Sequence, residues 1–98
     1  MRTALATLCV ACLLSSHAAR AQEEATVMYL ANQGVLVTAG DTGILFDPLF
    51  DADFDRFQLV PAELHAAMLA GEPPFDDVAA VFVSHAHADH FSAGMMLE

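Results

Sequence analysis

The chain has 98 residues and a formal net charge of −10, because 13 Asp and Glu side chains oppose only three Lys and Arg. This balance excludes a basic surface for nucleic acid phosphates and makes an anionic membrane an unfavourable partner. The hydrophobic share of 56% and the mean hydropathy of +0.48 exclude an acidic disordered tail.

Residues 1–21 have the layout of a secretory signal peptide. The segment starts with the positive Arg2, continues with the apolar run 4–14 and ends in small residues before Ala21. The apolar run is far shorter than the roughly 20 residues that a membrane span needs. We therefore expect cleavage after Ala21, no stable membrane anchor, and export to a bacterial periplasm or to the medium.

Cleavage would remove both cysteines, Cys9 and Cys12. The remaining chain then has no disulfide, no thiolate nucleophile and no cysteine ligand for zinc. A core of this size is marginal without disulfides, a metal or another chain. The composition therefore favours a part of a larger domain.

The first part of residues 22–98 predicts a three-stranded antiparallel meander. Three short apolar runs are separated by Asn-Gln-Gly and by Ala-Gly-Asp-Thr-Gly, and the third run ends at Asp47-Pro48. The predicted strands are 26–30, 35–38 and 44–46.

A loop and a helix are predicted next. Residues 49–60 are mixed and acidic, which is typical of a loop. Pro61 favours a helix start and Gly71 a helix end, and Leu64 and Met68 lie four positions apart on one face. The predicted helix spans 61–70.

The last part predicts a strand that leads into a polar loop. The continuous apolar run 78–84 is typical of a strand covered on both faces. Residues 91–98 predict the start of a second helix, with Ser92 as its N-cap. The order of strands, helix and further strand indicates an α/β layered domain.

Three histidines and an aspartate follow the last predicted strand directly, as His-Ala-His-Ala-Asp-His at 85–90. Imidazole and carboxylate are the zinc ligands open to a cysteine-free protein. In an extended turn His85 and His87 project to one side and can share a metal, whereas Asp89 and His90 turn away towards a second. The alternative is a solvated loop with accidental histidines, but α/β folds bind ligands at the carboxyl ends of their strands. The spacing therefore predicts a metal site.

These residues resemble the metallo-β-lactamase superfamily, whose signature is HxHxDH. VAAVFVSHAHADHFSAG is similar to the strand and metal loop of that family, and QGVLVTAGDTGILFDP to its opening strands. The resemblance implies that His85 and His87 bind a first metal and that Asp89 and His90 bind a second. It further implies that Asp89 orients the attacking water as a catalytic residue, and that Asp47 supports the loop by hydrogen bonding.

The fold implied by the resemblance is the N-terminal half of a four-layered αββα sandwich. Residues 22–98 would form a partial domain that is incomplete at its C-terminus. The family has a further His, a bridging acidic residue and a last His downstream, whereas no histidine follows His90.

The activity implied is metal-dependent hydrolysis of a small-molecule substrate. Two zinc ions, with iron or manganese as alternatives, would activate water against a lactam, lactone, thioester or phosphoester. The chain alone holds half a site and is expected to be inactive. Two alternatives stay open: an iron-dependent oxygenase or redox relative on the same fold, and an inactive metal-binding fragment. His65, on the predicted helix, is expected to be structural.

Overall fold

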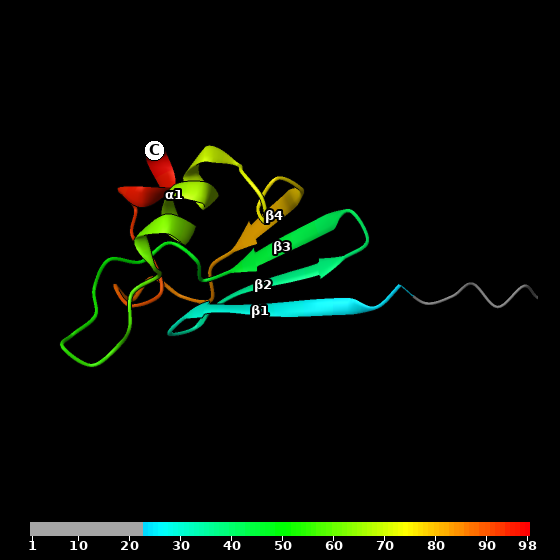
Figure 1. The fold of residues 1–98 in the computed structure, drawn as a ribbon. Coiled ribbons are helices and arrows are strands. Elements are labelled where there is room, and N and C mark those ends of the chain that lie inside the picture. The colour runs from blue at the N-terminus through cyan, green and yellow to red at the C-terminus, as the bar shows by residue number, and fades with distance from the viewer. Residues whose placement is uncertain (1–22) are drawn as a thin grey trace, which may run out of the picture.

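The computed structural model describes residues 23–98, so the predicted signal peptide lies outside the described residues. Within 23–98 the chain forms a four-stranded sheet with an α-helix on one side of it (Figure 1). The predicted mixed α/β class is confirmed. In chain order the elements are β1 (Ala25–Ala31), β2 (Gly34–Ala39), β3 (Thr42–Phe46), α1 (Ala62–Ala70), β4 (Val78–Phe82) and the 3₁₀ helix η1 (Met95–Leu97).

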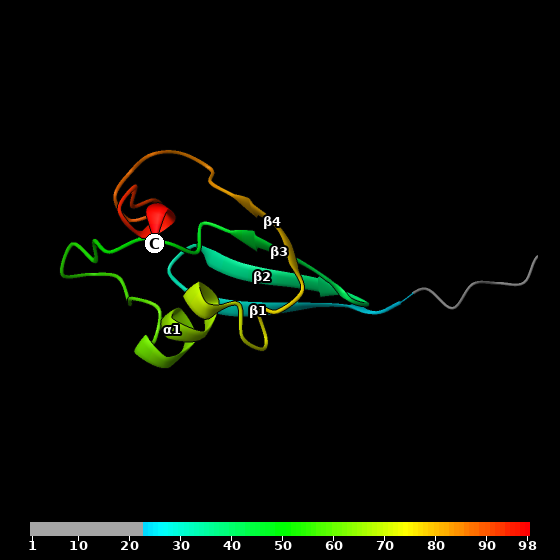
Figure 2. The ribbon, with the colours of Figure 1, turned by 90° about the horizontal axis from the view of Figure 1, so that it is seen from above.

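The strands lie in the order β1-β2-β3-β4. The pairs β1–β2 and β2–β3 are antiparallel, which confirms the predicted meander, and β4 pairs parallel to β3. Because only β2 runs in the opposite direction, the carboxyl ends of β1, β3 and β4 lie at one end of the sheet. The segments that follow β3 and β4 both extend beyond this end (Figure 2). Residues that follow these three strands are therefore brought together there.

The hydrophobic core lies between α1 and one face of the sheet. Leu64 and Met68 of α1, which lie four positions apart on one face of the helix, pack against it. Its buried members come from the strands and from the segment before β4: Leu30, Leu36, Leu45 and Phe75.

Both ends of α1 agree with the sequence signals. The helix begins after Pro61 and ends at Gly71, which has a φ of 63°. Glycine adopts this left-handed conformation without the clash of a Cβ atom. The backbone N–H of Glu72 donates to the carbonyl of Ala67 at 2.9 Å and closes the helix. Within 23–98, no helix is long and apolar enough to cross a membrane.

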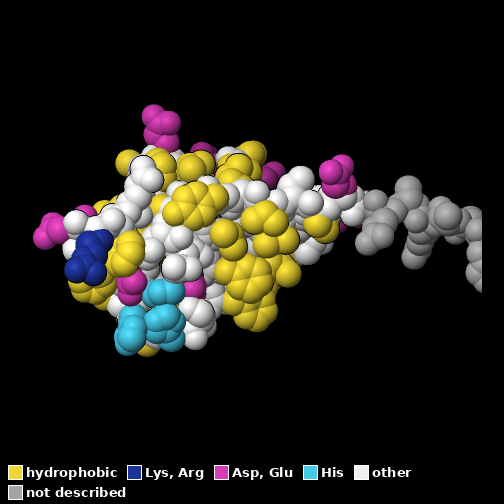
Figure 3. Space-filling view, turned by 90° about the horizontal axis from the view of Figure 1, so that it is seen from below, with side chains coloured by type: hydrophobic (Ala, Val, Ile, Leu, Met, Phe, Trp, Pro, Cys, Tyr) yellow, Lys and Arg dark blue, Asp and Glu magenta, His cyan; other side chains and the backbone are white. Residues whose placement is uncertain are grey.

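The opposite face of the sheet is apolar and carries no helix in the described part of the chain. Hydrophobic side chains gather there beside a cluster of histidines (Figure 3). Strand alternation and the observed register assign eight apolar side chains to this face: Val27, Tyr29, Val35, Val37, Ile44, Phe46, Ala80 and Phe82.

The prediction that β4 is covered on both faces is wrong for the described residues. Phe82 is paired with Phe46 on the face that carries no helix, and the residue is 52% exposed. A continuous apolar run indicates that both faces of a strand are hydrophobic. It does not indicate which other elements cover those faces.

The predicted helix after the histidine loop is also different in the structure. Only the short 3₁₀ helix η1 forms, and Ser92 does not cap it. The Ser92 hydroxyl instead donates to Asp51 Oδ2 at 3.1 Å, and its backbone N–H donates to the Leu49 carbonyl at 2.8 Å. The competing partners in the loop after β3 explain why Ser92 is not available as a cap.

Candidate metal centre

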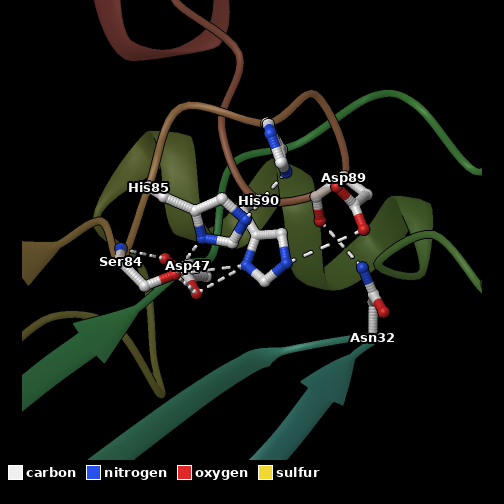
Figure 4. A network of polar contacts seen from close by, with 7 residues as sticks. Asn32, Asp47, Ser84, His85, Asp89 and His90 are labelled. Atoms are coloured by element: carbon white, nitrogen blue, oxygen red, sulfur yellow. Dashed lines mark hydrogen bonds and ion pairs between the residues drawn. The ribbon is translucent and has the colours of Figure 1, made fainter.

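Asp47 links the end of β3 to the loop that follows β4. The side chain is buried, with the residue only 5% exposed. Asp47 Oδ1 accepts a hydrogen bond from the backbone N–H of Ser84 at 2.7 Å, and Oδ2 accepts one from the Ser84 hydroxyl at 2.6 Å. His90 Nδ1 lies 2.9 Å from the same Oδ2 (Figure 4). One carboxylate therefore holds both the first residue and the last histidine of the loop.

The surroundings of Asp47 favour its ionised form. Burial acts to raise the pKa of Asp47, but the hydrogen bonds from the Ser84 side chain, His90 and the Ser84 N–H outweigh it, aided by the charge of His90. The pKa of Asp47 therefore lies below its ordinary value. At neutral pH Asp47 is an ionised carboxylate that can only accept hydrogen bonds.

These contacts decide which nitrogen of each ring carries a proton. Since Asp47 only accepts, His90 Nδ1 is the donor in this contact, which leaves Nε2 as the nitrogen that can face a metal, the arrangement found for metal-bound histidines. The Ser84 hydroxyl gives its proton to Asp47, so His85 Nδ1, 3.0 Å from Ser84 Oγ, must donate to that oxygen. In His85, too, Nε2 is therefore the nitrogen that can face a metal.

His85 and His87 face each other across a short gap. His85 Nε2 and His87 Nδ1 are 3.1 Å apart, and the ring centroids are 4.5 Å apart. Two nitrogens that share a tetrahedral zinc at 2.0–2.1 Å are separated by about 3.3 Å. The observed pair therefore has the spacing of two ligands of one ion.

The extended turn predicts that His90 turns away from His85 and His87. This prediction is wrong for the His90 ring. Its ring centroid lies 4.0 Å from that of His85, because Asp47 and Ser84 hold both rings on one side. His90 Nε2 and Asp89 Oδ2 are 3.7 Å apart. The four predicted ligands thus lie in one loop as two pairs.

The imidazole and carboxylate groups of the loop are suitable zinc ligands, but they are arranged in twos and not as a full set of four. Among residues 23–98 no group of three or more His, Cys, Asp or Glu side chains is arranged to hold a metal ion. A tetrahedral zinc site takes four ligands. The pair His85–His87 therefore accounts for half of such a shell.

The sequence of residues 30–98 matches the family model of the metallo-beta-lactamase superfamily. The chain belongs to the metallo-β-lactamase superfamily. This confirms the family resemblance over β2, β3, β4, α1 and the whole histidine loop, and over the end of β1. The chain matched no curated protein and no solved structure.

Two residues of this superfamily chain contribute to the site without having been predicted to do so. Ser84 bridges Asp47 and His85, and the Asn32 side-chain amide donates to the Asp89 carbonyl at 2.8 Å. The place of Ser84 directly before the first histidine could have drawn attention to it. Asn32 is 57 positions from its partner, and no local sequence pattern reports such a contact.

His65 lies on α1, as predicted. Its Nε2 is buried and has no hydrogen-bond partner among the described residues. It therefore serves as a histidine control outside the loop.

Proposed function

We propose that the chain forms the metal-binding part of a hydrolase that uses zinc held by the loop at 85–90. Membership of the metallo-β-lactamase superfamily supports this proposal. The observation that carries it is the 3.1 Å separation between His85 Nε2 and His87 Nδ1. Without an ion, one of these nitrogens must donate to the other, whereas zinc would accept both lone pairs.

In this proposal His85 and His87 hold a first ion, and Asp89 and His90 hold a second. Bound zinc supplies a water of lowered pKa, near about 7, and polarises a carbonyl or phosphoryl oxygen of the substrate. Asp47 keeps His90 Nδ1 protonated, and Ser84 does the same for His85. Both rings then present an unprotonated Nε2 for binding.

Asp89 is the proposed catalytic residue. Its carboxylate lies beside His90 Nε2 and is only partly shielded, with the side chain 18% exposed. It can therefore accept a hydrogen bond from a water near the ligand pair and fix the direction of that water's lone pair. The substrate is proposed to be a small molecule, since the acidic chain disfavours nucleic acid.

The remaining ligands are proposed to come from outside residues 23–98. Two imidazoles leave a tetrahedral shell half empty, so the described segment is expected to bind zinc weakly and not to turn over substrate. The sheet is also incomplete in this proposal, because its apolar face has no covering layer among the described residues. We propose that it is one layer of a four-layered αββα sandwich, with α1 as the outer layer and the apolar face as the contact between the sheets. Export through residues 1–21 completes the proposal.

The test is zinc binding by the full chain in a background with Cys9→Ser and Cys12→Ser, because thiolates would compete for zinc. Competition with a chromogenic chelator gives the affinity, and elemental analysis identifies the metal retained on purification. We expect zinc to bind, the double variant His85→Ala/His87→Ala to lose at least tenfold in affinity, and His65→Gln to bind as the parent does.

Equal affinity in the double variant would remove the support for these ligands. Retained iron with oxygen uptake would instead favour an oxygenase or redox relative over a zinc hydrolase.

A further inference from the structure

Asn32 connects the turn between β1 and β2 to the histidine loop. Its side-chain N–H donates to the backbone carbonyl of Asp89 at 2.8 Å, and this contact is partly buried (Figure 4). Asn32 has a φ of 49°, a left-handed conformation that Asn tolerates better than most residues. The turn therefore favours a residue that can both adopt this backbone and donate a hydrogen bond.

The carbonyl that Asn32 holds belongs to one rigid peptide unit. This planar group joins the Cα atoms of Asp89 and His90. A hydrogen bond to its oxygen fixes the rotation of the plane, and with it the directions from which both side chains leave the backbone. Asn32 thus acts on both members of the second ligand pair at once.

The same turn also packs against the residue that holds the His90 ring. A Cβ atom at Gly34 would lie 3.1 Å from the carbonyl oxygen of Asp47, which is tighter than ordinary contact. Gly34 therefore allows the turn to approach the Asp47 backbone closely. The β1–β2 hairpin supports the second pair in two ways: through the Asn32 side chain on the peptide plane, and through the close approach of Gly34, the first residue of β2, to the Asp47 carbonyl.

We propose that Asn32 is a positioning residue for the pair Asp89–His90, and that it acts by fixing the peptide plane between them. This inference rests on the proposed function, because it assigns the pair to metal binding. It predicts that loss of the amide donor loosens the loop in the metal-free chain and weakens metal binding in the loaded one.

Two variants remove the donor without straining the backbone. Asn32→Asp keeps the shape but its carboxylate cannot donate, and Asn32→Gly removes the side chain at a φ that glycine adopts freely. They differ in charge, so an effect common to both belongs to the lost donor. Gln33→Ala, an exposed neighbour in the same turn, is the matched control.

The first readout is amide hydrogen exchange at His90 and Phe91 in the metal-free chain. Both N–H groups donate to the His87 carbonyl at 2.9 Å and so report whether the loop is closed. We expect exchange at both positions to be at least about tenfold faster in the two Asn32 variants and unchanged in Gln33→Ala.

The second readout is zinc affinity together with the visible spectrum of the cobalt-loaded chain, in the cysteine-free background. We expect zinc affinity to fall by about tenfold and the cobalt bands to shift, as for other residues that orient metal ligands. Parent-like exchange, affinity and spectrum in both variants would overturn the role of Asn32 while leaving the proposed function intact. No zinc binding by the parent chain would instead overturn the proposed function, and with it the metal role of Asn32.

Discussion

The two proposed ligand pairs of the loop, Asp89–His90 and His85–His87, differ in how the protein holds them. His90 is only 14% exposed in its side chain, is held by buried Asp47, and follows a peptide plane that Asn32 fixes. His85 and His87 are exposed and contact each other, and His85 also contacts Ser84 and the His90 ring. The fold therefore organises the second pair in advance, whereas an ion would be needed to fix the first.

This difference follows from where the two pairs lie in the chain. The ends of β1 and β3 supply Asn32 and Asp47, which reach the His90 end of the loop. At the His85 end the support is indirect: Asp47 accepts two hydrogen bonds from Ser84, and Ser84 in turn contacts His85 Nδ1. Variants should accordingly have distinct effects on stability and on zinc binding at the two pairs.

The largest effect on stability is expected for Asp47→Ala. The change removes three hydrogen bonds to a buried carboxylate, and a hydrogen bond to a charged group contributes about 1.5–3 kcal/mol. We expect the free energy of unfolding to fall by about 3 kcal/mol in urea titrations. Asp41→Ala, an exposed turn residue, is the control; equal losses in both variants would contradict the role of Asp47.

A comparable effect, but only with zinc, is expected for His85→Ala/His87→Ala. Zinc at about 100 times its Kd should stabilise the parent by about 2.7 kcal/mol, because it binds the folded chain. The double variant should keep the metal-free Tm and lose the rise with zinc, whereas His65→Gln should retain it. A zinc-dependent rise of the same size in the double variant would show that the exposed pair is not the first site.

Ser84→Ala should cost about 1 kcal/mol, since it removes the hydroxyl while the backbone N–H still reaches Asp47. The lost hydrogen bond also makes the pKa of Asp47 less depressed. A depressed pKa gives stability that is present above the unfolded value and lost as the pH falls through the folded value. The acid unfolding midpoint of the metal-free chain should therefore move to higher pH than in the parent. A midpoint at lower pH would contradict the assignment.

The smallest effect is expected for Ser92→Ala, beyond the two pairs. The Ser92 hydroxyl contacts Asp51 at an exposed position, so the change should alter stability by less than about 0.5 kcal/mol. Zinc affinity should stay within twofold of the parent. A loss of stability as large as that of Ser84→Ala would contradict this expectation and show that the Ser92 contact also holds the loop.

Local patterns were enough to predict the meander, α1 and the position of the histidine loop. Apolar runs between turn residues mark the strands, and Pro61 and Gly71 mark the helix ends. The covering of β4 and the helix at 91–98 were predicted wrongly because both depend on distant neighbours. The elements that cover a strand and the competing partner of Ser92 are not encoded in short windows of sequence.

The site likewise has features that local sequence predicts and features that only the structure reveals. HxHxDH is a local spacing, and the closeness of His85 and His87 follows from it. The family resemblance pointed to Asp47, which the structure places against Ser84 and His90. The contact of Asn32 with the Asp89 carbonyl depends on the packing of two turns that lie far apart in sequence, so only the structure reveals it.

The central claim is that Asp47 fixes the His90 ring before a metal binds, whereas an ion is needed to fix His85 and His87. Long-range ¹H–¹⁵N NMR spectra of the histidine rings, recorded with and without zinc, test it most directly because they report the protonated nitrogen of each ring. The account predicts a proton on His90 Nδ1 in both states, and shifts of His85 Nε2 and His87 Nδ1 when zinc is added. A proton on His90 Nε2, or rings of His85 and His87 that zinc leaves unchanged, would contradict it.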